Sequence, residues 1–122
     1  MMANQLVSNR ENSELKKVVV TIDFSSMSNV TLFTGRKNGK AAKPYFDVKQ
    51  GTFYIFKAND DQVITSSYFL GLVGDELSNL LGDLENISEL LEHIDTENIS
   101  AISKNECVRA IKRGLSPDVA TL

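Results

Sequence analysis

The chain of 122 residues contains only one cysteine and one histidine, and this scarcity limits the chemistry it can carry. Cys107 has no second cysteine with which to form an internal disulfide, as is typical of proteins from reducing compartments. His93 belongs to no metal-binding set of recognisable spacing, and no Cys-His pair suited to nucleophilic catalysis is evident. We therefore expect a protein that is not an enzyme and has no metal or cofactor. Cys107 is expected to pack at the base of its helix, and His93 to be structural or on the surface.

The sequence also lacks a long apolar run. Its longest uncharged apolar-rich stretch, residues 63–74, is far shorter than the roughly 20 residues that a membrane-spanning helix needs. Residues 1–14 are polar and have no hydrophobic signal region, so we expect a cytoplasmic protein with no membrane association. The length favours a single domain over residues 15–116, with a flexible N-terminal arm (residues 1–14) and a C-terminal tail (residues 117–122).

Charge is distributed unevenly along the chain. Residues 1–57 carry nine Lys and Arg against four Asp and Glu, a net charge of +5, whereas residues 58–122 carry four against twelve, a net charge of −8. These values sum to the net charge of −3 of the whole chain. The asymmetry either marks two differently charged faces or disappears when the two halves interleave in the fold.

Three segments in the first half have the pattern of β-strands. Residues 16–24 contain a β-branched run, and residues 30–34 form a second short strand that we expect to pair with it as a hairpin. Residues 52–58 are apolar on both faces, which is typical of a strand in the middle of a covered sheet. A helix is predicted around residues 37–43, where Pro44 would end it.

The most informative stretch is a cluster of three hydroxyls, Thr65, Ser66 and Ser67, that follows the polar turn of residues 59–62. An amphipathic helix starts directly after the cluster, because the following apolar residues have helical spacing: 69, 72, 73, 77, 80 and 81. Thr65 and Ser66 are good N-cap candidates, since their oxygens can accept hydrogen bonds from the first amides of the helix. The same position favours an anion, because the helix dipole and unpaired amides point there.

This helix is predicted over residues 67–81, and Gly71 and Gly74 within it would lower its stability unless their small size permits close packing. Residues 88–94 fit either a helix or a strand, with the helix slightly favoured by the residues themselves. A final amphipathic helix is predicted over residues 104–115, capped by Asn105 or Ser103. Together these elements predict an α/β fold with a small mixed sheet of about four strands and about three packed helices.

The basic segment of residues 36–49 suggests a different function. It begins with a Gly-x-x-x-Gly-Lys run that differs from a phosphate-binding P-loop, because the glycines are separated by three residues and Ala41 follows Lys40. We therefore interpret the run as a basic turn. Its cluster of cations could instead contact a nucleic-acid backbone, which is the alternative function that we consider: Arg36, Lys37, Lys40 and Lys43.

Residues 64–69, Ile-Thr-Ser-Ser-Tyr-Phe, followed by a helix, resemble the STAS-like domain family, relatives of the bacterial anti-sigma-factor antagonists. In the antagonists the corresponding segment reads Asp-Ser-Ser-Gly, and one of its serines is phosphorylated by a partner kinase. Thr65 falls on the Asp, Ser66 and Ser67 on the two serines, and Tyr68 on the Gly, so two of the four positions differ.

Two further segments are similar to the same family, and the resemblance covers roughly residues 17–115. Residues 105–113 are similar to the closing Asn-x-x-Val-Arg-x-x-Ile-x-Arg helix of STAS-like proteins, and Gly35-Arg36 fits the start of the segment before the central strand. The resemblance implies a STAS-like fold with a strand near residues 91–94. It also implies a regulatory protein-interaction domain whose partner is an ATPase-type serine kinase or an anti-sigma-like protein.

For the site, the resemblance implies a Ser/Thr phosphoswitch at the start of the helix: Thr65, Ser66 and Ser67. The partner-binding surface is expected to continue along the exposed side of that helix: Tyr68, Asp75 and Asn79. The acidic side chains of residues 75, 76, 83 and 85 are expected to be solvated, with an interaction surface as the alternative. Two other functions stay open, namely a structural subunit in which Ser66 only caps the helix, and a small enzyme whose site the sequence does not reveal.

Overall fold

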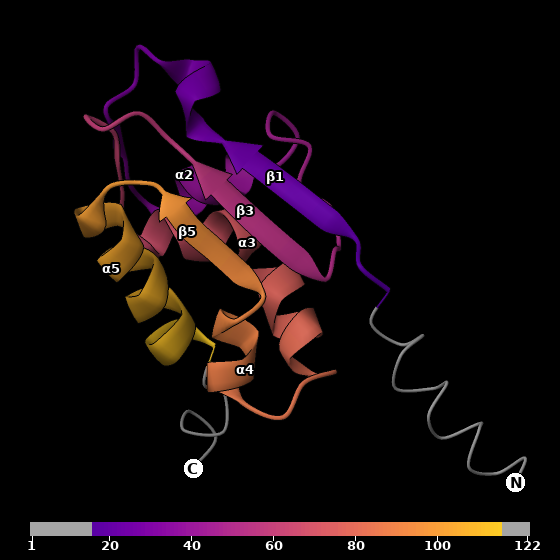
Figure 1. Cartoon of the computed structure of the whole chain (residues 1–122). Helices are drawn as coiled ribbons and strands as arrows, with labels where there is room; N and C mark the ends of the chain where they lie inside the picture. Colours follow the sequence, from indigo (N-terminus) through magenta and orange to yellow (C-terminus); the bar gives the residue numbers. More distant parts are fainter. Residues whose placement is uncertain (1–15, 116–122) are drawn as a thin grey trace, which may run out of the picture.

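The computed structural model describes residues 16–115, which form an α/β fold around a three-stranded sheet (Figure 1). Its strands are β1 (Val19–Asp23), β3 (Phe53–Lys57) and β5 (Ile94–Asn98), in the order β1-β3-β5. Both strand pairs are parallel, so the expected mixed sheet is corrected to a parallel one. The reason is that each strand is joined to the next by a crossover containing a helix, which returns the chain in the same direction. The strand predicted at residues 52–58 lies in the centre of this sheet, as expected, but within residues 16–115 helices cover only one face of the sheet.

A second, two-stranded sheet pairs β2 (Leu32–Phe33) with β4 (Val63–Ile64), also in parallel. The predicted hairpin between the first two strands is therefore wrong. Residues 24–27 form a 3₁₀ turn, η1 (Phe24–Met27), whose Phe24 side chain is completely buried. This anchored turn leads the chain away from the edge of β1, so that β2 meets a strand about 30 residues later in the sequence.

The described residues contain four α-helices where about three were predicted, and their bounds differ from the predicted ones by a few residues. They are α2 (Arg36–Ala41), α3 (Ser66–Leu81), α4 (Ile87–Leu91) and α5 (Ala101–Arg109), and the π-helical turn η2 (Ala110–Gly114) extends α5. The ambiguous residues 88–94 divide between a helix and a strand, since α4 ends at Leu91 and β5 begins at Ile94. The final helix begins earlier than predicted because Ser100 is its N-cap and accepts a hydrogen bond from the Ser103 amide. The predicted arm and tail lie outside the described residues.

The core lies on one face of the sheet. Val20, Ile22, Tyr54 and Phe56 point to this face and are at most 6% exposed. Figure 1 shows α2 and α3 behind the sheet, on the side where the core lies. Five aromatic rings surround that of Phe24, with centroids 5.1 to 6.3 Å away: Phe33, Phe46, Phe56, Tyr68 and Phe69. This cluster joins the large sheet, β2 and α3 into one core.

Helix α2 packs closely against α3 through two glycines. A Cβ atom on Gly71 would lie 1.9 Å from the carbonyl oxygen of Arg36, and one on Gly39 would lie 2.2 Å from that of Tyr68. The requirement for a small residue predicted at Gly71 is therefore confirmed, whereas a Cβ at Gly74 would make only ordinary contacts with Leu70. The close approach brings the start of α2 beside the start of α3. Within residues 16–115, none of the helices has the length and apolar character needed to cross a membrane.

Candidate functional site

The candidate site is the N-terminus of α3, where Thr65 acts as the predicted N-cap. Its backbone is extended, with φ −83° and ψ 160°, and its Oγ1 accepts a hydrogen bond from the Tyr68 amide at 3.4 Å. The same hydroxyl lies 3.2 Å from the carbonyl oxygen of Phe33 in β2, to which it donates. Thr65 therefore joins the start of α3 to the small sheet.

The hydroxyl of Ser67 is also held by the fold. Its Oγ accepts a hydrogen bond from the Gly35 amide at 3.2 Å and lies 3.2 Å from Thr65 Oγ1. Gly35 precedes α2 and has a φ of 97°, a left-handed conformation that side chains rarely tolerate. This glycine turn brings its amide to Ser67. Two of the three predicted hydroxyls thus connect α3 to the neighbouring elements.

Ser66 differs from its two neighbours. Its side chain is partly exposed, and its hydroxyl makes no hydrogen bond within the described part of the chain. Its backbone amide donates to Glu106 Oε1 of α5 at 2.7 Å. A carboxylate is favourable there because the amides at a helix start carry partial positive charge. The negative group expected at this helix start is thus supplied by the protein itself.

Sequence reasoning did not identify Glu106. The only available signal was its position inside the C-terminal helix that resembles the STAS-like pattern. Glu106 lies 40 residues from Ser66 in the sequence, and nothing local indicates that the two meet.

Tyr68 was expected on the partner-binding surface, but it lies in the core. Its side chain is 5% exposed, and its ring packs against those of Phe24 and Phe33, with centroids 6.3 and 5.4 Å away. The burial raises the pKa of its hydroxyl. Tyr68 contributes only to the floor of an open hollow of about 200 Å³, with an otherwise mainly apolar lining: Met27, Val30, Leu32, Phe33, Thr34 and Asn38.

Asp75 and Asn79 are exposed on α3, as expected for surface residues, but they lie away from the hydroxyls. With a rise of about 1.5 Å per residue, Asn79 lies roughly 20 Å along the helix from Ser66. Its side-chain amide donates to Gln50 Oε1 at 3.2 Å. The structure therefore brings Thr65, Ser66, Ser67 and Glu106 together and leaves Asp75 and Asn79 on a separate part of the helix.

Glu76 was expected to be solvated, but it forms an ion pair. Lys43 Nζ lies 2.7 Å from Glu76 Oε1 and also donates to the Leu72 carbonyl at 3.1 Å, with both charged side chains largely buried. Lys43 therefore fixes the segment after α2 to α3 and is withdrawn from the basic cluster. The other cations of that cluster are exposed on α2: Arg36, Lys37 and Lys40.

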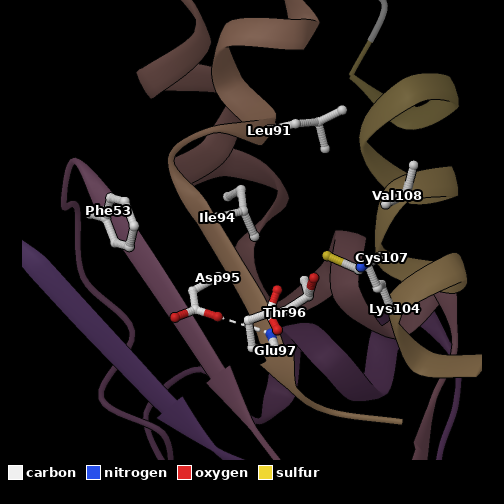
Figure 2. A pocket seen from close by; sticks show the side chains of 9 residues that line it. All are labelled: Phe53, Leu91, Ile94, Asp95, Thr96, Glu97, Lys104, Cys107 and Val108. Carbon is white, nitrogen blue, oxygen red and sulfur yellow. Dashed lines mark hydrogen bonds between the residues drawn. The ribbon is translucent and has the colours of Figure 1, made fainter. Parts of the chain in front are cut away.

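A larger hollow, of about 410 Å³, lies beside the edge strand β5 and helix α5 (Figure 2). Its lining mixes apolar and charged side chains: Phe53, Leu91, Ile94, Asp95, Thr96, Glu97, Lys104, Cys107 and Val108. Cys107 is 1% exposed, and burial raises the pKa of its thiol to about 12, so the sulfur stays protonated at neutral pH. His93 is not part of this lining. Its Nδ1 donates a hydrogen bond to the Thr52 carbonyl at 2.6 Å. The geometry gives Cys107 and His93 separate, structural surroundings.

No protein family, curated protein or solved structure matches this chain. Its chemistry must therefore be argued from its own residues. Within residues 16–115 there is no group of three His, Cys, Asp or Glu side chains placed to hold a metal ion. The α3 N-terminus is the site where structural and sequence observations coincide.

A buried polar contact that the sequence did not predict supports this site. Gln62 is completely buried, and its Nε2 lies 2.9 to 3.0 Å from the carbonyl oxygens of Phe24, Met27 and Val30, which share its two N–H donors. Ser103, also completely buried, accepts a hydrogen bond from the Ile64 amide at 3.0 Å. Together they hold β4, and hence the hydroxyl cluster that follows it, against the 3₁₀ turn and α5.

Proposed function

We propose that this chain is a cytoplasmic regulatory protein-interaction domain, in which the surface around Ser66 contacts a protein partner. The observation that carries the proposal is that the three hydroxyls differ in their hydrogen bonds. Those of Thr65 and Ser67 hold neighbouring elements, whereas that of Ser66 is partly exposed and makes no hydrogen bond to any of residues 16–115. A hydroxyl with no structural role is the one that modification can change without disturbing the fold. The resemblance to STAS-like proteins supports the same conclusion.

A phosphate on Ser66 would compete with Glu106. The phosphate would carry nearly two negative charges and would lie beside the carboxylate that accepts the Ser66 amide. Both anions favour the same helix N-terminus, so their repulsion would displace Glu106 while the phosphate takes over the amide contacts. We therefore expect the modification to preserve α3 and to alter the charge of the surface that a partner contacts. An ATPase-type serine kinase or an anti-sigma-like protein is the class of partner that the resemblance favours.

The test compares partners retained from host lysate by the immobilised wild-type chain, Ser66→Glu and Ser78→Glu. Ser78 is an exposed serine of the same helix, so Ser78→Glu controls for the added charge. We expect a kinase-like or sigma-regulating protein to be retained by the wild type and by Ser78→Glu, and to be reduced at least tenfold with Ser66→Glu. Mass spectrometry identifies the retained proteins, and circular dichroism verifies that each variant is folded.

Two results would count against the proposal. Equal retention of the partner by all three proteins would remove Ser66 as the controlling residue. The absence of any partner of this class in the wild-type sample would contradict the interaction function itself.

A further inference from the structure

One face of the three-stranded sheet has no helix on it within residues 16–115. Side chains alternate along β3, so Tyr54 and Phe56 are buried in the core while Phe53 and Ile55 point to the opposite face and are partly exposed. Val19 pairs in register with Phe53 on that face and is 46% exposed. Figure 1 shows this face toward the viewer, with α2 and α3 behind the sheet. Parallel sheets almost always have both faces covered, so this uncovered face is unusual.

The uncovered face, which we call the open face, has an apolar centre of Val19, Phe53 and Ile55. Its two edges carry opposite charges. On the β1 side, Lys17 Nζ lies 5.2 Å from the centroid of the Phe53 ring. On the β5 side, Asp95 pairs in register with Ile55 and so points to the same face.

Other titratable groups on the open face leave this polarity unchanged. Glu97 lies past the register shift in the β3–β5 pairing and lines the hollow, so it adds a second negative charge at the β5 edge. Asp23 and Lys57 are paired in register and carry opposite charges side by side, so they add no net charge. His93 packs near Phe53, and its Nδ1 donates to a backbone carbonyl.

We propose that the open face is the interface of a homodimer, in which a second copy of this chain packs against it face to face. The two-fold axis would run between the sheets, parallel to the strands. This rotation places β3 on β3 of the second copy, so that Phe53 and Ile55 meet their own equivalents across a spacing of about 10 Å. It also places the β1 edge of each copy over the β5 edge of the other.

Charge selects this arrangement among the two-fold alternatives. With the axis parallel to the strands, Lys17 of one copy faces the side of the other that carries Asp95 and Glu97. With the axis in the same plane but perpendicular to the strands, β1 would lie antiparallel over β1 and β5 over β5, so Asp95 would face β5 of the other copy instead of its β1 edge. The first arrangement is self-complementary, as an isologous interface requires.

The hollow beside β5 supports a second copy as the occupant. Phe53 and Asp95 belong both to the open face and to this hollow, which extends past the free edge of β5 to apolar side chains of α4 and α5. In the proposed dimer the start of β1 of the second copy lies nearest to this recess. Val18 and Val19 are there, 43% and 46% exposed, and would gain apolar contacts. A nucleic acid or an anionic membrane would prefer a face of one sign.

The dimer is independent of the function proposed for Ser66. That residue begins α3, which packs on the covered side of the sheet, so a second copy on the open face leaves Ser66 accessible. Failure of one proposal therefore has no bearing on the other.

Sedimentation equilibrium of the full chain at low salt tests the proposal first. We expect the wild type to sediment as two chains of 13.5 kDa each at micromolar concentrations. Ile55→Lys should sediment as a single chain, because it places two ammonium groups opposite each other at the centre of the apolar contact. Ile102→Lys is the matched control, since Ile102 is a 60% exposed isoleucine on α5, outside the open face. It should remain a dimer.

A charge exchange tests the orientation, and circular dichroism verifies the fold of each variant because Asp95 Oδ1 also accepts a hydrogen bond from the Glu97 amide at 2.9 Å. Lys17→Glu and Asp95→Lys should each raise the dimer dissociation constant about tenfold or more, and the double variant should restore it to within a few-fold of the wild type. A wild type that is monomeric at 100 µM (roughly the upper end of a specific weak dimer) would overturn the proposal. A dimer that Ile55→Lys leaves intact would overturn it as well, and additive weakening in the double variant would reject the β1-over-β5 orientation.

Discussion

Gln62 and Ser103 show how single polar residues hold this fold together. Both are completely buried, and both serve backbone groups that belong to other elements. Ser103 supplies the acceptor for the Ile64 amide in β4, while Gln62 serves three carbonyls around the 3₁₀ turn and accepts the Asn59 amide at 2.7 Å. Buried polar groups are costly when unpaired, so each of these side chains is a stability determinant out of proportion to its size.

Replacing Ser103 should therefore be more harmful than replacing an exposed serine. We expect Ser103→Ala to lower the free energy of unfolding by about 1–3 kcal/mol, because the Ile64 amide loses its partner in the core. Ser78→Ala, at an exposed position in α3, gains the same helix propensity and loses no such bond, so it should be neutral or slightly stabilising. Urea unfolding measures both, and equal effects of the two substitutions would show that the buried bond contributes nothing.

At the scale of elements, the packing of α2 on α3 positions the candidate site. The backbones of the two helices approach so closely that Gly39 and Gly71 face carbonyl oxygens of the opposite helix. This approach also places Gly35 where its amide reaches Ser67, and Lys43 where it reaches Glu76. The start of α3 is thus fixed from the side by a helix of only six residues.

The two glycines inside α3 should respond oppositely to substitution. In Gly71→Ala the new methyl group would collide with the Arg36 carbonyl, and we expect a loss of about 1–3 kcal/mol because the helices must separate. In Gly74→Ala the methyl group has room, so the higher helix propensity of alanine should stabilise the protein by roughly 0.5–1 kcal/mol. Thermal unfolding of both variants provides the comparison. Stabilisation by both would mean that α2 does not pack on α3 as described.

At the scale of the whole molecule, three buried acidic protons link stability to alkaline pH. Burial raises the pKa values of Cys107, Tyr54 and Tyr68 above their ordinary values of 9.0 and 10.0. Each group therefore keeps its proton in the folded chain at a pH where the unfolded chain releases it. Their contribution to stability is complete below pH 9 and is lost as the pH rises through the folded pKa, which for Cys107 is about 12.

We accordingly expect the free energy of unfolding to be nearly constant between about pH 7 and 8.5 and to fall above pH 9, where the unfolded thiol ionises. The slope above pH 9 should be smaller in Cys107→Ala, which lacks this thiol but retains both tyrosines. Urea unfolding at a series of pH values measures the slopes. Identical slopes in the two proteins would show that Cys107 does not contribute to the alkaline loss of stability.

Local sequence patterns were sufficient to identify the strand at β3, the extent of α3 and the capping role of Thr65. Each depends on residues that are near each other in the chain, namely an apolar run, a helical spacing and a hydroxyl before a helix. The division of residues 88–94 was harder, because a five-residue helix and a strand follow each other there within a few residues. Short elements of this kind carry too little periodicity to be separated.

The sequence by itself determined that the chain is α/β, that Thr65 caps a long helix, and that three hydroxyls gather there. The tertiary structure alone determined that the strands are parallel, that β2 pairs with β4, and that Glu106 reaches the Ser66 amide. It also determined which side of the sheet is left without a helix by residues 16–115. The physical reason is distance along the chain: these features depend on backbone and side-chain contacts between residues 30 to 40 positions apart, which periodicity and capping rules do not describe.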